Sequence, residues 1–575
     1  MKTNGRIREL LATRCFNESH FDDRVVKPLL EYLGIPSEAR IPQFPIENPF
    51  GEGVLRLDHL VHHGDLPLAT VEVKPTSRQF EAGFRQAKNY SRNFKPRQAG
   101  CPMQERTVPF FLTVAGERAE MCRAVVRGLN IEYEPIRHEG RPAFLEWQEL
   151  LAEAGQMRPS AAARATQQVV VADVARQFFN DLYEPLNAAA SLRGKDDQKI
   201  ILFNAIIDLA RRRQLSRVQA ACTTAGLGQR AAAKVLKTIA WYRQKIEANE
   251  FVGAAVARGY RSFLLQPGGR GGHCYFTGES QSRPFRDGRR ISYRNVARYF
   301  TPTEVCQQMV RLAHPRATAR VLDMTSGSGI FLAECVDLVA REEGEGAAER
   351  FLIRRLVGID DDPFCVSCSR ALLTFLYPQH ADKLQVFLHN SLYQQAPRRS
   401  EIDEDPRAEQ HLRPGQYDLV IGNPPGNDEY SGSNRAEVAR QWAERFGHSE
   451  GGLMDHHCFL RRAVELARPD GGRVCLLVPE GLLARDNRAM PALREALLKE
   501  CELRAVVSLP RVFKNNNARM AVVYLVRGVP ARARRKVLLA EVREHWTDAE
   551  GHQQATDVFG ELEEIVTRFL AGDRG

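Results

Sequence analysis

The chain has 575 residues, of which 43% are hydrophobic, so it is long enough for two to four domains with sizeable cores. Lysine and arginine (81) outnumber aspartate and glutamate (71), and the net charge of +10 at pH 7 suits an acidic partner such as nucleic acid. Apolar runs of membrane-spanning length, a secretion signal and a disulfide framework are not evident. We therefore expect a cytoplasmic protein with no membrane partner and reduced cysteines.

The first expected elements are a helix and a pair of strands. Residues 18–33 carry apolar side chains at helical spacing, and strands are expected at 54–61 and 68–74 around a turn. Glu72 and Lys74 are two positions apart on the second strand, so both side chains should lie on one face of the sheet. Carboxylates beside a lysine can hold a divalent metal ion and position water for attack on a phosphodiester.

Three further residues extend this pattern. Asp58 lies on the adjoining strand, and Gln86 and Tyr90 lie four positions apart on one face of the next expected helix. Over residues 15–120 the segment resembles the PD-(D/E)xK nuclease domain at the N-terminus of type I restriction subunits. The resemblance implies that Mg²⁺ is bound by Glu18, Asp58 and Glu72. It implies that the catalytic residues are Asp58, Glu72, Lys74, Gln86 and Tyr90. The alternative is an ordinary hairpin with solvated charges.

A change to Ala, Arg, Gln and Leu at residue 151 begins a segment, 151–265, that we expect to be a helical connector. Helices are predicted within it at 169–186, 197–213 and 230–247. The basic run at 209–213 either meets phosphates or forms a solvated face. Residues 266–298 are rich in glycine and arginine, and we expect a flexible linker that leads into the next domain.

The next stretch, Val321–Leu332, contains an apolar run, Asp323, two glycines and a second apolar run, which predicts a strand, a tight turn and a helix. Glycine lets a ligand approach the main chain, and a helix N-terminus favours a carboxylate or phosphate. A second strand ends at Asp360, where an acid can hold ribose hydroxyls in a doubly wound sheet. A third strand, 418–422, leads into Asn423-Pro424-Pro425.

In this order and spacing, the motifs resemble the N6-adenine DNA methyltransferases of restriction–modification systems, which use S-adenosylmethionine. The resemblance implies a doubly wound α/β domain that acts on a base flipped out of double-stranded DNA. It assigns cofactor contacts to Tyr299, Phe300, Thr301, Pro302, Asp323, Gly327, Ser328, Gly329, Asp360 and Asn390. It also implies that Asn423, the Pro424 carbonyl and Pro425 hold the target amino group.

Three positions depart from the family pattern. Met324 stands where the family has proline after the aspartate, which is a mild change. Asn390 stands where a carboxylate usually contacts the cofactor adenine, although an amide oxygen can also accept. Gly426 stands where the family has an aromatic ring, and base–aromatic stacking is worth about 1–3 kcal/mol. Either Tyr430 replaces that ring in a slow methyltransferase, or the domain is a non-catalytic scaffold that senses cofactor and docks DNA. In the second case the nuclease alone performs chemistry.

Three other segments receive structural interpretations. Cys365 and Cys368, and the run His456–Cys458, are expected to be structural residues of helices and not metal ligands. Residues 393–416 are polar and are expected to form a surface insertion. A helix with the apolar stripe Phe559, Leu562, Val566 and Phe569 either docks a partner or packs against the chain's own core.

The expected fold class is therefore α/β, with the following parts: a PD-(D/E)xK nuclease-like domain (1–150), a helical connector (151–265), a linker (266–298), a methyltransferase domain (299–545) and a C-terminal helix (546–575). A nuclease fused to a methyltransferase, without its own specificity domain, resembles the restriction–modification subunit of type IIB systems. That resemblance implies phage defence by DNA cleavage and adenine methylation, with a separate specificity subunit. A further alternative is a methyltransferase with an inactive N-terminal domain.

Overall fold

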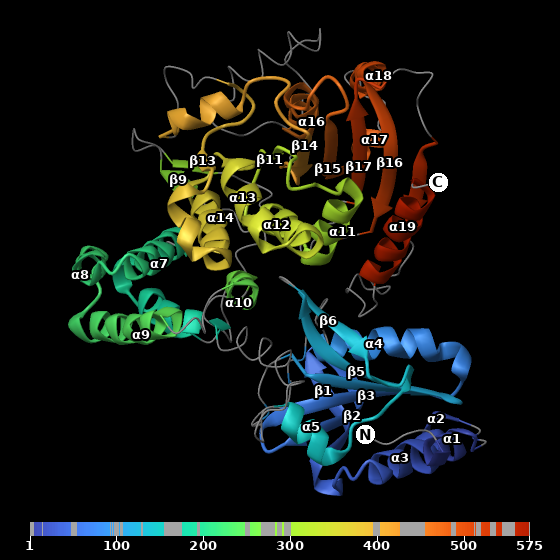
Figure 1. The fold of residues 1–575 in the computed structure, drawn as a ribbon. Helices are drawn as coiled ribbons and strands as arrows, with labels where there is room; N and C mark the ends of the chain where they lie inside the picture. Colours follow the sequence, from blue (N-terminus) through green and yellow to red (C-terminus); the bar gives the residue numbers. More distant parts are fainter. Residues whose placement is uncertain are drawn as a thin grey trace. The chain divides into compact units, whose positions relative to one another are not determined.

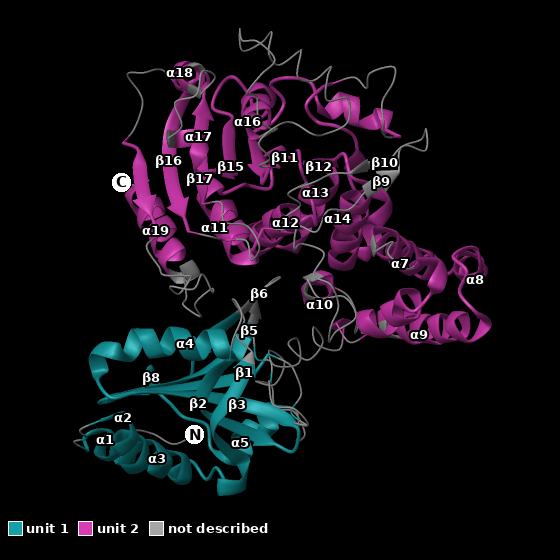
Figure 2. Cartoon of the chain, turned by 180° about the vertical axis from the view of Figure 1, so that it is seen from behind, with its two compact units in different colours: residues 1–174, 544–560 teal, residues 175–543, 561–575 magenta. Residues whose placement is uncertain are grey.

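The computed structural model of the chain contains two compact units (Figures 1 and 2). The first consists of residues 1–174 and 544–560, and the second of residues 175–543 and 561–575. The structure describes residues 5–573 except 14, 16, 48–53, 93, 95, 97–102, 104–106, 128–129, 155–174, 177, 193–195, 248–252, 266–281, 285–289, 293–300, 395–402, 426–454, 485–489, 511, 513–518, 530–535 and 543–557. Within this part of the chain, every helix is too short or too polar to cross a bilayer.

The first unit is built on a six-stranded sheet whose strands follow chain order. Its strands are β1 (Arg40–Glu47), β2 (Val54–His63), β3 (Leu66–Lys74), β4 (Phe110–Ala115), β5 (Arg118–Arg127) and β6 (Asn130–Pro135). Neighbouring strands are antiparallel except β3 and β4, which are parallel. A parallel pair needs a crossover, and α4 (Phe80–Arg92) provides it. A short hairpin, β7 (Arg137–His138) and β8 (Arg141–Pro142), follows the sheet.

Helices cover both faces of this sheet (Figure 1). One face packs against the N-terminal helices α1 (Gly5–Leu11), α2 (Glu18–Phe21), the π-helical turn η1 (Asp22–Val26), α3 (Lys27–Tyr32), and against α5 (Trp147–Glu153). The opposite face lies under α4. The expected helix at 18–33 is confirmed, and its apolar positions Phe21, Val25, Leu29 and Leu33 are buried. Because both faces are covered, the middle of β3 is buried throughout.

The second unit contains an eight-stranded sheet in the order β13-β12-β11-β14-β15-β17-β16-β18. The strands are β11 (Val321–Asp323), β12 (Leu356–Asp360), β13 (Val386–Leu388), β14 (Leu419–Gly422), β15 (Arg473–Pro479), β16 (Cys501–Leu509), β17 (Met520–Arg527) and β18 (Leu538–Glu541). The first five are parallel and β17 is antiparallel to its neighbours. The strand order reverses between β11 and β14, which places the expected ligand crevice at their carboxyl ends.

Helices flank the sheet of the second unit on both faces (Figure 1). They are α11 (Thr303–Ala313), α12 (Ile330–Glu343), α13 (Glu345–Arg354), α14 (Pro363–Leu376), η5 (Pro378–Lys383), η6 (Pro406–His411), α16 (Asp455–Leu466), α17 (Gly481–Ala484), α18 (Met490–Glu500) and α19 (Val558–Asp573). A separate two-stranded sheet contains β9 (Ser282–Pro284) and β10 (Arg290–Ser292). The rest of the predicted linker, 266–298, lies outside the described residues.

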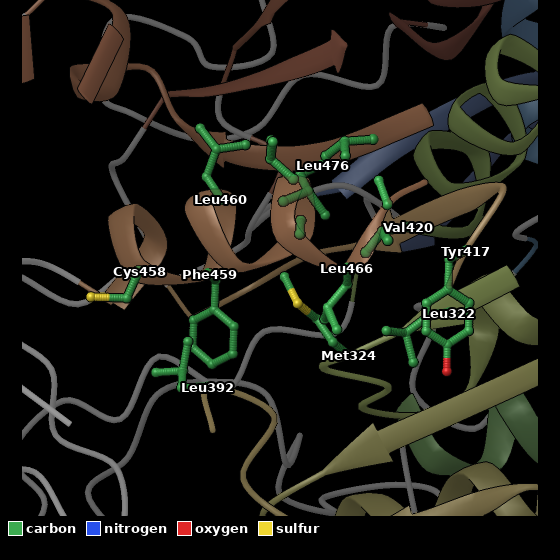
Figure 3. Close-up of a cluster of buried hydrophobic side chains, with 14 of the residues drawn as sticks. Leu322, Met324, Leu392, Tyr417, Val420, Cys458, Phe459, Leu460, Leu466 and Leu476 are labelled. Carbon is green, nitrogen blue, oxygen red and sulfur yellow. The ribbon is translucent and has the colours of Figure 1, made fainter. Parts of the chain in front are cut away.

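The core between the sheet and α16 shows one correction to the sequence analysis (Figure 3). Leu460 and Leu466 of α16 pack in one buried cluster with Val420 and Leu476 of the sheet. Ala408 and Leu412 belong to the same cluster, although they fall in the segment expected to be a surface insertion. That expectation is wrong for these residues, because two apolar side chains are enough to anchor an otherwise polar segment.

The helices expected to form a connector belong to the second unit. They are α7 (Asp196–Arg211), α8 (Leu215–Thr224), α9 (Gln229–Glu247) and α10 (Ala254–Leu265), and α7 and α10 pack against α14. Asn204 accepts a hydrogen bond from Tyr260 (2.8 Å) and donates to Ser367 of α14 (2.9 Å). The rings of Phe179 and Tyr260 lie 5.1 and 5.0 Å from that of Phe375. The segment is helical as expected, but it is part of a core and not a free connector.

The basic run after α7 is a paired surface. Arg211 and Arg212 both contact Asp208 and Asp382, and Arg213 contacts Glu247 at 3.2 Å. These arginines are therefore neutralised within the chain, as in the solvated alternative. Cys365, Cys368 and His456–Cys458, interpreted in the sequence as structural residues of helices, lie in α14 and α16 and are all buried.

The C-terminal helix α19 packs on the second unit. Leu562 and Val566 are 2% and 1% exposed, and the Arg504 guanidinium lies 5.7 Å from the centre of the Phe569 ring. Arg311 of α11 also contacts Glu563 at 3.2 Å. Leu562, Val566 and Phe569 therefore pack against the chain's own core, which was the alternative to a partner-docking helix.

Candidate functional site

The first candidate site lies in the nuclease-like unit, at the carboxyl end of β3. Asp58 of β2 and Glu72 and Lys74 of β3 lie on the sheet face covered by α4, and the Lys74 ammonium contacts Glu72 Oε1 at 2.7 Å. The paired part of β2 and β3 ends at His59 and Val71. Beyond it the Val73 N–H donates to Asp58 Oδ2 (2.7 Å), so the aspartate side chain replaces the missing main-chain acceptor.

Burial strongly perturbs the acids of this site. Glu72 is 4% exposed, and burial together with the negative charge of Asp58 raises its pKa to about 8. Burial also raises the pKa of Asp58, against the hydrogen bond from Val73. Lys74 has a raised pKa because the nearby carboxylates outweigh the effect of its own burial. The buried Glu72 and the half-buried Asp58 repel each other when both are ionised, and a cation would stabilise their ionised form.

Helix α4 approaches these residues closely. A Cβ at Gly83 would lie 2.9 Å from Lys74 Cγ, so glycine permits the close packing of helix and strand. Gln86 is one turn later, and its Oε1 is buried without a hydrogen-bond partner among the described residues. Tyr90 is 5% exposed, and burial and the charges of Glu72 and Asp58 raise its pKa. Gln86 and Tyr90 therefore lie on the helix that packs over the acidic residues.

Glu18, the first residue of α2, is near enough for its charge to raise the pKa values of Glu72 and Lys74. The described residues nevertheless hold no group of three or more His, Cys, Asp or Glu side chains arranged to bind a metal ion. Mg²⁺ commonly uses one or two carboxylates and keeps several waters. Asp58 and Glu72 fit that requirement, whereas Glu18 as a ligand stays a prediction.

The second candidate site follows β11 in the second unit. The turn Thr325–Gly329 leads into α12, whose first N–H groups face the carboxyl end of the sheet. Gly327 and Gly329 have φ angles of 53° and 81°, and a Cβ at Gly329 would lie 2.8 Å from Ser369 Cα. Glycine is therefore required at Gly329 by both conformation and space. Ser328, the remaining predicted contact of this turn, is buried.

Asp323 at the end of β11 is fully buried. Its Oδ1 accepts a hydrogen bond from the Thr325 N–H (3.1 Å), while Oδ2 is buried without a partner among the described residues. Burial raises the pKa of Asp323 to about 8. A Cβ at Gly422 would lie 2.6 Å from Oδ1, so the strand before Asn423 approaches Asp323 as closely as a main chain can.

Asp360 ends β12 and connects two turns. Its Oδ2 accepts from the Gly327 N–H (2.9 Å) and its Oδ1 from the Asp362 N–H (3.0 Å). Burial and the charges of Asp361 and Asp362 raise the pKa of Asp360. Each oxygen retains a lone pair, so Asp360 can still accept from a ligand hydroxyl.

The other predicted cofactor contacts are distributed over three elements. Thr301 is buried and Pro302 half-buried before α11, whereas Tyr299 and Phe300 lie outside the described residues. Asn390, after β13, is buried, and its Oδ1 accepts from the Leu392 N–H (3.0 Å). Asn423 and Pro425 are half-buried and Pro424 is buried after β14, whereas Gly426 and Tyr430 lie outside the described residues.

Asp323, Asp360, Asn390 and Asn423 follow the carboxyl ends of the neighbouring parallel strands β11, β12, β13 and β14, so these predicted residues lie at one edge of the sheet. Comparison with known proteins identifies this part of the chain. Residues 291–572 match the model of the family described as N-6 DNA Methylase. This segment is thus an N-6 DNA methylase domain with the α/β fold of S-adenosylmethionine-dependent methyltransferases.

Three solved structures are similar to the chain at low identity. A chain of a type I R–M system is 16% identical, over 70% of this chain and 84% of its own, with a TM-score of 0.48. The type IIG restriction endonuclease BpuSI is 14% identical, over 96% of this chain and 61% of its own, with a TM-score of 0.44. The chain in the DrdV–DNA complex is 14% identical, over 98% and 58%, with a TM-score of 0.43.

The N-6 DNA methylase domain has the features that S-adenosylmethionine requires. The unpartnered Asp323 oxygen, the Asp360 carboxylate and the glycine turn before α12 offer acceptors and main-chain donors at one place. The described residues therefore fit the cofactor.

Two residues of the domain were missed in the sequence. Arg462 is buried and donates to the carbonyls of Ser391 (3.0 Å) and Leu412 (2.7 Å), which fixes the segment after Asn390. Glu404 accepts hydrogen bonds from the Asn390 N–H (3.1 Å) and the Tyr393 hydroxyl. The sequence gives no signal for either residue. The partners of Arg462 are 50 or more positions away along the chain, and those of Glu404 are 11 to 14 positions away, in segments without periodicity.

Proposed function

We propose that the chain is a restriction–modification protein that cleaves double-stranded DNA with a Mg²⁺-dependent nuclease and methylates adenine at N6. The nuclease function is carried by one observation, the buried Glu72 with the half-buried Asp58 and Lys74 beside it. The methyltransferase function rests on the N-6 DNA methylase domain. The net charge of +10 is compatible with a DNA partner.

In the nuclease unit, Asp58 and Glu72 would hold the metal ion, with Glu18 as a possible third ligand. Mg²⁺ bound there would supply Lewis-acid stabilisation of the phosphate and a more acidic water. Lys74 is held beside this position by its contact with Glu72, where its ammonium can stabilise negative charge on the phosphate or orient the attacking water. Gln86 and Tyr90 would position the DNA or the water from the α4 side.

In the methylase domain, the Asn423 side chain and the Pro424 carbonyl would accept hydrogen bonds from the target amino group. Accepting those protons makes the nitrogen more tetrahedral and exposes its lone pair, and the base must first leave the stack. Bound S-adenosylmethionine supplies the electrophilic methyl group. Pro425 limits the conformations of the main chain at this point, and Asp323 and Asp360 would hold the cofactor beside it.

A separate specificity subunit completes the proposal. This part of the proposal rests on the resemblance of a nuclease-like segment, 15–120, joined to the methylase domain, 291–572, to the restriction–modification subunit of type IIB systems. Co-purification of the chain with the product of a neighbouring gene would test this partner. A chain that cleaves and methylates one defined DNA site when purified alone would contradict it.

The test of the nuclease compares wild type with Asp58→Ala and Lys74→Ala on unmethylated phage DNA, with Mg²⁺ and with EDTA. We expect both variants to lose cleavage while S-adenosylmethionine binding, measured by calorimetry, stays unchanged, because the two sites lie in different units. Glu117→Ala, in an exposed turn of the same unit, is the matched control. Persisting Mg²⁺-dependent cleavage in either variant would remove these residues from the active site.

A second candidate function is a non-catalytic methylase domain that binds cofactor and docks DNA. Gly426 favours it, because losing about 1–3 kcal/mol of stacking lowers occupancy of the extruded base by roughly 5- to 150-fold. Of the two functions we expect the methyltransferase, acting slowly because Tyr430 replaces the missing ring. The measurement is methyl transfer by wild type, Tyr430→Ala and Gly426→Tyr. An inactive wild type that Gly426→Tyr does not rescue, with cofactor binding intact, would favour the scaffold.

A further inference from the structure

One residue near Asp58 has an unusual main-chain conformation. Among the described residues, four that are not glycine have positive φ angles: Gln43 (52°), Glu139 (49°), Arg213 (61°) and His314 (45°). Arg213 and His314 follow helices, and Glu139 lies in the turn of the β7–β8 hairpin, where positive φ closes the turn. Gln43 differs from these three because it lies inside strand β1.

The position of Gln43 in the sheet is opposite Asp58. Pro42 pairs with His59 and Phe44 pairs with Leu57, so the register is continuous around Gln43 while Gln43 itself leaves the ladder. Its carbonyl accepts a hydrogen bond from Arg56 Nη1 at 3.2 Å instead. A left-handed conformation in mid-strand is unfavourable for glutamine, and such strain concentrates at functional sites.

The Gln43 side chain reaches the catalytic carboxylate. Its Nε2 donates to Asp58 Oδ1 at 3.4 Å, and the Val73 N–H donates to Asp58 Oδ2 at 2.7 Å. Each carboxylate oxygen therefore has one donor and keeps a lone pair for a further partner. With Val73 alone, the carboxylate could still rotate about its single hydrogen bond, and the amide of Gln43 removes that freedom.

We propose that Gln43 is a positioning residue of the nuclease site, whose amide orients the Asp58 carboxylate for binding a divalent metal ion. The inference rests on the proposed nuclease function. Hydrogen bonds to a metal-binding carboxylate set its direction, and loss of such a partner typically reduces metal affinity or activity about 10- to 100-fold. The strain at Gln43 is then a consequence of aiming its side chain at Asp58.

Two substitutions separate the hydrogen bond from the strain. Gln43→Gly removes the amide and also relieves the positive φ, whereas Gln43→Met removes the amide and keeps the strain. Glu139→Gly relieves a similar φ at an exposed turn of the same unit and is the matched control. For the full chain, three quantities are measured: Tm in EDTA, Mn²⁺ affinity by calorimetry without DNA, and Mg²⁺-dependent cleavage of unmethylated phage DNA.

We expect Gln43→Gly and Gln43→Met to weaken Mn²⁺ binding and cleavage about 10- to 100-fold. Gln43→Gly should keep or raise Tm although its Mn²⁺ affinity and cleavage fall. The control Glu139→Gly should keep wild-type metal affinity and cleavage. Wild-type metal affinity and cleavage in both Gln43 variants would overturn the inference. If the wild-type chain does not bind Mn²⁺ or cleave DNA, and Asp58→Ala gives the same result, the nuclease function is wrong. The inference about Gln43 is then wrong as well.

Discussion

The protonation of Glu72 predicts a pH-dependent stability of the nuclease unit. The pKa of about 8 lies above the ordinary 4.5 because of burial and the charge of Asp58. Between these two values the folded state binds more protons than the unfolded state, so stability falls as pH rises through that window. The full difference corresponds to at most about 5 kcal/mol, lost progressively between about pH 4.5 and 8. Glu72→Gln has no such proton and should lose this dependence.

The assay is urea unfolding in EDTA at pH 5.5, 6.5 and 7.5, with pulsed hydrogen exchange of β3 and β4 peptides so that only the first unit is followed. We expect Glu72→Gln to become more stable relative to wild type with each step in pH, while cleavage is lost. Glu81→Gln makes the same chemical change at an exposed position of α4 and should follow wild type. Parallel profiles for wild type and Glu72→Gln would refute the raised pKa.

Two further predictions concern the second unit. Gly422→Ala should abolish measurable S-adenosylmethionine binding in calorimetry, because the new Cβ would lie 2.6 Å from Asp323 Oδ1. The control Gly346→Ala should bind the cofactor normally, because its Cβ would meet only the end of an arginine side chain, 3.5 Å away. Equal affinities would contradict the close approach of β14 to Asp323. Leu562→Ala should lower the free energy of unfolding by about 2–5 kcal/mol in urea titrations, because the side chain is buried in the chain's own core; an unchanged stability with loss of a partner would favour docking instead.

The sequence predicts the elements whose pattern is local. Alternation and apolar runs identify β2, β3, β11, β12 and β14, and helical spacing identifies α4 and α12. The spacing of Glu72 and Lys74 also predicts correctly that these two side chains lie on one face, where they are in contact. These inferences succeed because strand and helix periods fix side-chain direction without knowledge of the partner.

The remaining features depend on contacts between distant segments. Strand β13 has three residues, too few for a periodic signal, and the exit of Gln43 from its ladder leaves no trace in residue type. The helices predicted at 197–213 and 230–247 correspond to α7 and α9, whereas α8 and α10 were not predicted individually, and an amphipathic pattern does not reveal which surface its apolar face contacts. For the same reason, the support that Arg462 gives to the segment after Asn390 could not be anticipated.

The packing of α7 and α10 against α14 also affects where the chain can be divided. Phe375 of α14 is 2% exposed with these helices in place, and its ring contacts come from Phe179 and Tyr260. Gene fragments that begin at residue 299 would expose this aromatic surface and invite aggregation. Recombination that exchanges the first unit for another module would preserve the methylase only when the crossover falls before residue 175, so the helices and the methylase should be inherited together.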